Sequence, residues 1–229
     1  MNPKYSLIIP FYNEKENLAE LHERILRVLP QLGPAEILYV DDGSTDGGAG
    51  VLAGKDCKVL ALETRSGKSA ALFAAFQEAR GEFFILLDAD LQNPPEEIPK
   101  LAGYLKEAEL AAGVRKKRHD SWAKKTMSTC GNGLRKRMLQ DDIEDAACGM
   151  LAFHRELRRY FFPLEGMNRF FKTVVKKNGH QVVQVEIEHC PRKRGKSKYG
   201  FANRFFKTGM DLMAAAWLLS QRVKYRVRR

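Results

Sequence analysis

Two aspartates one residue apart follow a strongly apolar run in FFILLDADLQNPP, residues 83–95. Side chains at alternate strand positions point to the same side about 6.6 Å apart, so Asp88 and Asp90 can serve one centre where the strand ends and bends. Unpaired carboxylates beside a buried strand are costly, and a hard cation such as Mg²⁺ or Mn²⁺ that joins them to phosphate oxygens removes that cost. The pattern therefore indicates a metal and phosphate site.

Other uses of this acidic pair stay open. Asp88 can cap the helix that follows and Asp90 can meet a lysine, which are common arrangements for acids at strand ends. Two carboxylates can also act as acid and nucleophile in glycoside hydrolysis, but that chemistry usually takes its pair from separate segments across a cleft.

The segments around the aspartates alternate between strand and helix patterns. This alternation predicts an α/β fold with a Rossmann-like, mostly parallel sheet and helices on both faces. The first helix should pack five residues of one apolar face on the sheet: Leu18, Leu21, Ile25, Leu26 and Leu29. The expected strands are 5–12, 36–44, 58–63 and 82–87, and the expected helices are 14–29 and 66–80.

Polar residues stand at the ends of three expected strands. Ligands of open α/β sheets bind beyond the carboxyl ends of the strands, where the strand order switches. A binding site is therefore expected at this edge. The residues are Asn13 and Glu14, then Asp41, Asp42 and Ser44, and finally Asp88 and Asp90.

The charge of the chain is divided unevenly. Residues 1–112 hold 11 Lys/Arg against 18 Asp/Glu, whereas residues 113–229 hold 28 against 10. The basic half predicts an anionic partner, either nucleic acid, an anionic membrane or a phosphorylated substrate. In that half we expect one alternating strand, at 181–189, before the basic run PRKRGKSKYG.

Several familiar motifs are incomplete. Gly48, Gly50 and Ala53 fit a loose dinucleotide pattern but do not directly follow a strand, and Leu62 stands where a phosphate loop ending in SGKS requires glycine. The histidines and four cysteines lack metal-ligand spacing, and we interpret the cysteines as free thiols. The N-terminus lacks an export signal, and the apolar run at 212–219 is too short to cross a bilayer.

Six segments in the same order resemble family 2 glycosyltransferases with a GT-A fold, within them the dolichyl-phosphate mannose synthase-like and bacterial undecaprenyl-phosphate sugar transferases. They are SLIIPFYNEKENL, ILYVDDGSTDG, RSGKSAALFAAFQEARGEFFILLDADLQNPPEEIPKL, DSWAKKTMSTCGNGLRKRML, DAACGMLAFHR and PRKRGKSKYGFANR, and they span most of residues 5–204. The resemblance implies a metal-dependent, inverting transfer of a sugar from a UDP- or GDP-sugar to a polyprenyl monophosphate.

The resemblance also assigns roles to individual residues. Asp90 and Asp145 would be catalytic, and Asp88, Asp90 and Gln92 would hold Mg²⁺ or Mn²⁺ against the donor diphosphate. Ala146 and Ala147 depart from the Thr-Gly pair that is commoner between Asp145 and Cys148-Gly149. The nucleotide-sugar would contact Pro10, Tyr12, Glu14, Asp41, Asp42, Lys68 and Asp88. The acceptor phosphate would contact Arg115, either Lys124 or Lys125, Ser128, Arg192 and Lys198.

The expected organisation is a GT-A domain at 1–198, with a donor half at 1–112 and an acceptor half at 113–198, and then a basic amphipathic tail at 199–229. Aromatic and basic residues interleave in the tail, as in helices that lie on an anionic membrane surface. Packing on the sheet, or a position just before a missing membrane span, would give the same pattern. The resemblance places the protein in the cytoplasm, peripheral on the cytoplasmic membrane face, and leaves room for a homo-oligomer.

Two other functions compete with sugar transfer to a lipid phosphate. A protein or a glycan could replace the lipid acceptor in the same fold. The basic half could instead bind nucleic acid, which would show as duplex binding with a steep salt dependence and no sugar turnover. The acidic strand ends argue against nucleic acid as a partner.

Overall fold

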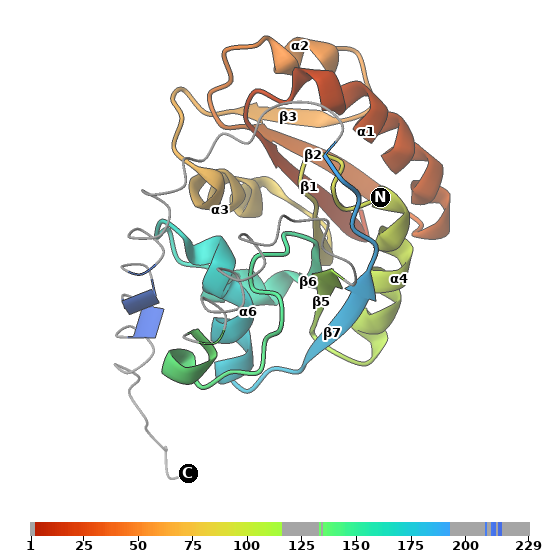
Figure 1. The fold of residues 1–229 in the computed structure, drawn as a ribbon. Coiled ribbons are helices and arrows are strands. Elements are labelled where there is room, and N and C mark those ends of the chain that lie inside the picture. The colour runs from red at the N-terminus through yellow and green to blue at the C-terminus, as the bar shows by residue number, and fades with distance from the viewer. Residues whose placement is uncertain are drawn as a thin grey trace, which may run out of the picture.

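The computed structural model describes residues 3–115, 133, 135–192, 209, 212, 213, 215 and 216. Within this part, seven strands form one sheet in the order β3-β2-β1-β4-β6-β5-β7 (Figure 1). All neighbours are parallel except β6, which runs antiparallel to β4 and β5, so the expected mostly parallel sheet is confirmed. The strands are β1 Tyr5–Phe11, β2 Ala35–Asp41, β3 Lys58–Ala61, β4 Phe83–Leu86, β5 Leu110–Arg115, β6 Leu151–His154 and β7 Val182–Ile187.

Helices cover both faces of the sheet, as predicted (Figure 1). Because strand side chains alternate, Leu7 and Ile9 join one buried cluster with α1 and α4, whereas Ile8 joins a second cluster with α3 and α6. The helices are α1 Lys15–Val28, α2 Gly48–Val51, α3 Lys68–Glu78, α4 Ile98–Gly103 and α6 Met167–Lys177, with short 3-10 turns at Leu29–Gln31, Pro95–Glu97, Tyr104–Lys106 and Arg155–Tyr160.

The apolar face of α1 is narrower than expected. Leu18, Leu21 and Ile25 are fully buried, but Leu26 is 41% exposed, so its assignment to the buried face was wrong. Each helical residue is turned about 100° from the one before it, which carries Leu26 out of the stripe that contains Ile25.

The second half of the chain adds more strands than predicted. The strand at 181–189 is confirmed as β7, but β5 and β6 were missed. Both are short and buried, so they show no alternation of polar and apolar residues. Strand β6 enters between β4 and β5 and pairs Leu151 with Leu86, which brings the segment before β6 against the end of β4.

Gly81 has no room for a side chain at the start of β4. A Cβ atom there would lie 2.6 Å from the backbone nitrogen of Ser6, while the Gly81 amide donates to Ser6 Oγ at 2.8 Å. We expect Gly81→Ala to lower the free energy of unfolding by about 1–3 kcal/mol, because β1 would have to shift. Gly50→Ala is the control, since open space surrounds Gly50 in α2. Equal urea midpoints for the two variants would contradict this prediction.

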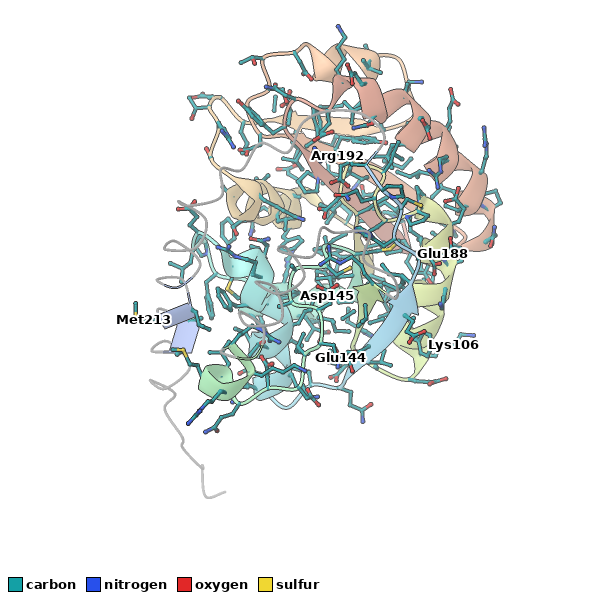
Figure 2. All side chains as sticks on the ribbon, in the orientation of Figure 1. Lys106, Glu144, Asp145, Glu188, Arg192 and Met213 are labelled. Atoms are coloured by element: carbon teal, nitrogen blue, oxygen red, sulfur yellow. The ribbon has the colours of Figure 1, made fainter. Side chains whose placement is uncertain are left out.

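Most of the predicted tail at 199–229 lies outside the described residues. Among those described, Leu212 and Met213 are helical; Leu212 packs on Leu139 and Phe170, while Met213 points away from the body of the protein (Figure 2). Ala215 and Ala216 pack against the same cluster, so packing on the domain is seen for three of the described tail residues. In the part of the chain that the structure describes, no helix combines the length and the apolar character needed to cross a membrane.

Candidate active site

The predicted site residues gather at one edge of the sheet. The carboxyl ends of β1, β2, β4, β5 and β7 meet there, together with the amino end of β6. The register aligns Phe11 with Asp41 and Leu86 with Leu151, so loops far apart in the sequence become neighbours. This is the edge at which α/β sheets bind ligands.

Asp88 lies between a lysine and a glycine. Its Oδ1 forms an ion pair with the Nζ of Lys68, the first residue of α3. Burial disfavours the charged form of Lys68, but the acidic groups around it, chiefly the Asp88 carboxylate, together raise the pKa of the lysine. The carboxyl group also packs on Gly149, where any Cβ atom would collide with it.

Asp90 is held by Arg192, which follows β7. The Arg192 guanidinium donates to Asp90 Oδ2 at 2.8 Å and to Glu14 Oε1 at 3.3 Å. Burial opposes this arginine's charge, yet the two carboxylates raise its pKa. The Cys190 amide donates to the Gln92 carbonyl at 2.8 Å, which draws the segment after β7 over the end of β4. Figure 2 shows Arg192 carried from β7 toward β1 and β2.

Asp145 and Arg115 form a two-point ion pair. Arg115, the last residue of β5, donates from Nε to Asp145 Oδ2 at 2.6 Å and from its terminal nitrogen to Oδ1 at 2.8 Å. Such paired bonds fix the orientation of the guanidinium plane. The Cys148 amide donates to the same carboxylate at 3.2 Å, and burial raises the pKa of the Cys148 thiol.

The loops after β1 and β2 are tied together. Asn13 has a left-handed backbone conformation. Its side-chain Oδ1 accepts from the Thr45 backbone amide at 2.7 Å, and its backbone amide donates to Ser44 Oγ at 2.9 Å. The buried Asp41 accepts from the Ser44 amide at 2.7 Å. The bonds from Asn13 to Ser44 and Thr45 join the loop after β1 to the loop after β2.

Two other residues predicted to contact the nucleotide-sugar, Asp42 and Tyr12, have partners within the protein. The buried Asp42 carboxylate accepts from the backbone amides of Ser66 and Gly67 at 2.7 and 2.9 Å, so it holds the loop before α3. The guanidinium of Arg65, from that loop, lies 4.3 Å from the centre of the Tyr12 ring. Pro10, near the end of β1, is half-buried.

The side-chain oxygen atoms at the end of β4 are of the type that binds a hard divalent cation. Asp88, Asp90 and Gln92 offer oxygen ligands and all three remain partly exposed. Mg²⁺ commonly takes one or two protein carboxylates and completes its shell with water and phosphate oxygens. In the described residues the two carboxylates instead have cationic partners, and no three acidic, histidine or cysteine side chains cluster as a metal site.

Four predicted acceptor residues lie outside the described residues: Lys124, Lys125, Ser128 and Lys198. Cys57, Cys148 and Cys190 are free thiols, as expected for the cysteines that the structure describes.

Sequence reasoning missed Lys172, which is fully buried beneath Asp145. No motif marks it, since it stands in a helix among apolar neighbours.

Comparison with known proteins identifies the family of this chain. Residues 6–161 match the model of the family described as Glycosyl transferase family 2. The undecaprenyl-phosphate 4-deoxy-4-formamido-L-arabinose transferases of Proteus mirabilis (strain HI4320) and Serratia proteamaculans (strain 568) are each 35% identical. The alignments cover 86% of this chain and 63% of each relative, so the chain spans under two thirds of their length.

Among solved structures, glucosyl-3-phosphoglycerate synthase from Mycobacterium tuberculosis, crystallised with Mg²⁺ and uridine diphosphate, superposes with a TM-score of 0.76 at 17% identity. The match covers 97% of this chain and 81% of that one. A structure of the same enzyme with Mn²⁺, uridine diphosphate and glucosyl-3-phosphoglycerate gives a TM-score of 0.72. At this identity the likeness concerns the fold, which is the expected GT-A architecture. By its sequence the chain belongs to glycosyl transferase family 2.

Proposed function

We propose that this protein transfers a sugar from a nucleotide-sugar to a polyprenyl monophosphate, with inversion at the anomeric carbon. The observation that carries the proposal is the meeting of acids and cations at one sheet edge: Asp88 and Asp90 lie beside Lys68 and Arg192. The names of the curated relatives support undecaprenyl phosphate as the acceptor to test first.

The donor would bind along β1, β2 and β4. Pro10, Tyr12, Glu14 and Asp41 line the strand ends where an open sheet receives a nucleotide. Lys68, at the first position of α3, can meet a diphosphate oxygen once that anion competes for its ammonium group. The uridine diphosphate in the solved neighbours makes UDP-sugars the first donors to test.

Asp88, Asp90 and Gln92 would hold Mg²⁺ or Mn²⁺. The ion would supply positive charge to the departing diphosphate. Arg192 must then give up or share Asp90, because the guanidinium and the ion would use the same carboxylate. Its release would leave a charged guanidinium close to the donor site, available for an acceptor phosphate.

The acceptor would enter beside β5 and the segment after β7. Arg115 ends β5 and Arg192 follows the neighbouring strand β7, and Asp145 fixes the plane of the Arg115 guanidinium. A phosphate monoester has a second pKa near 6, so it is largely a dianion at neutral pH and attacks without a strong base. The protein would therefore act mainly by orienting the phosphate oxygen in line with the bond that breaks. Asp145 would position the acceptor through Arg115.

The lipid acceptor implies action at the cytoplasmic face of a membrane. Basic residues near an anionic leaflet contribute about 1 kcal/mol each to attachment. Residues 113–229 hold 28 Lys/Arg, so a small outward-facing share would suffice. Vesicle sedimentation with and without an anionic lipid tests this attachment.

Transfer of radiolabelled sugar into an organic-extractable product tests the function. Wild-type protein, undecaprenyl phosphate and Mn²⁺ are incubated with a panel of labelled UDP- and GDP-sugars. Label in the organic phase supports the proposal. Transfer that leaves the label in water would identify a protein or glycan acceptor instead, and no transfer with tight duplex binding would favour the nucleic-acid alternative.

Arg192→Ala should raise the KM for the acceptor by about tenfold, because one phosphate ligand is lost. The affinity of the free protein for Mn²⁺ should rise at the same time, since Asp90 loses its competing cation. Arg155→Ala is a matched control, because that arginine meets the Arg80 carbonyl at the opposite sheet edge. Initial rates and Mn²⁺ titration by electron paramagnetic resonance measure the two effects, and an unchanged acceptor KM would contradict the assignment.

A further inference from the structure

Lys172 is a fully buried lysine at the centre of α6. Its Nζ donates to the carbonyl oxygen of Asp145 at 2.6 Å and to that of Cys148 at 2.9 Å. Burial lowers the pKa of the ammonium group. A lysine in such a place costs desolvation energy that an apolar residue would avoid, so its partners identify what it is there to hold.

Those partners belong to one turn, residues 145–149, which meets the site at both ends. At one end Asp145 binds Arg115 through both carboxylate oxygens. At the other end Gly149 supports the carboxyl group of Asp88. A shift of this turn would therefore move the groups proposed for the acceptor and those proposed for the donor together.

The same face of α6 holds the preceding segment as well. Thr173 donates to the Asp141 carboxylate, and Lys176 pairs with Asp142 at 2.5 Å. These contacts secure the segment before the turn, but neither touches a proposed site residue. Lys172 differs because it binds the backbone of Asp145 itself.

We propose that Lys172 is a positioning residue: it fixes the turn at 145–149 and so sets where Arg115 meets the acceptor phosphate. The proposal rests on the proposed function for its catalytic consequence. The effect of Lys172 on phosphate binding at Arg115 can be measured without sugar transfer.

Lys172→Met keeps the length of the side chain and removes the donors. Relief of desolvation and loss of two carbonyl partners act in opposite directions, so we expect a melting temperature within about 4 °C of wild type. The Kd for dodecyl phosphate, measured by calorimetry, should rise about tenfold, and the KM for undecaprenyl phosphate should rise similarly, because small misplacements at a site are costly. The Kd for uridine diphosphate with Mn²⁺ should rise as well, because the same turn supports Asp88 through Gly149.

Lys176→Met is the control on the same helix, since that lysine is partly exposed and pairs with Asp142 only at the surface. Lys172→Gln keeps an uncharged N–H donor group on a shorter side chain and should fall between wild type and Lys172→Met; it carries the test if the methionine variant does not fold. A wild-type Kd for dodecyl phosphate in both variants, or no binding by the wild type, overturns the proposal. A wild type that binds the phosphate but transfers no sugar would refute the proposed function and leave the binding comparison to decide the role of Lys172.

Discussion

Replacing Asp90 with asparagine is expected to lower the rate of sugar transfer by about 10²–10³-fold, the range seen when one preorganised electrostatic group is lost. The change keeps the shape of the side chain and removes its charge. Asp90 and Glu14 both accept hydrogen bonds from Arg192, and Asp90 is proposed to hold the cation that balances the departing diphosphate. Initial rates at saturating donor, with Mn²⁺ titrated, measure the effect.

Two controls separate this result from a loss of folding. Asp142→Asn removes a carboxylate from an exposed pair with Lys176 and should leave the rate unchanged. The circular dichroism melt of Asp90→Asn should resemble that of the wild type, because Asp90 is partly exposed and Glu14 remains to accept from Arg192. A rate within about twofold of wild type would remove Asp90 from the proposed mechanism.

Gly149→Ala is expected to lower the rate by about 10²-fold, with little change in stability. The added methyl group would collide with the Asp88 carboxyl, which is the movable end of a side chain and can turn away at small cost. Turning away breaks the ion pair with Lys68 and withdraws an oxygen from the proposed metal site. Transfer assays and thermal melts on the same preparations measure both quantities.

Gly103→Ala in α4 is the matched control, because a Cβ atom there meets nothing within 4 Å. It should keep the wild-type rate. If Gly149→Ala melted far below the wild type, the contact between Gly149 and Asp88 would serve the stability of the fold rather than sugar transfer. If it kept full activity, the position of Asp88 would not matter for transfer.

The order of strands and helices in the first half was readable from the sequence because it depends on local periodicity. The apolar face of α1 and the buried β1, β2 and β4 follow from residue spacing, with Leu26 the exception. The acids at the ends of β2 and β4 were recognisable for the same reason, since a charged residue after an apolar strand stands out within a few positions.

The second half could not be read in this way. Strands β5 (LAAGVR) and β6 (LAFH) hold few β-branched or aromatic residues, so neither stands out as a strand, and the place of β6 between β4 and β5 depends on pairing across the sheet. The resemblance supplied Arg115 and Asp145 as separate residues. Their direct pairing depends on β5 and the turn before β6 meeting at one edge.

The sequence by itself determined which residue types gather at the strand ends and that the domain is α/β. Only the tertiary structure decided their partners. It placed Arg192 on Asp90, 102 residues away along the chain, and Lys172 beneath Asp145. The physical reason is that the free energy of a buried charge depends on the groups around it in space, and those come from segments whose separation along the chain carries no periodic signal.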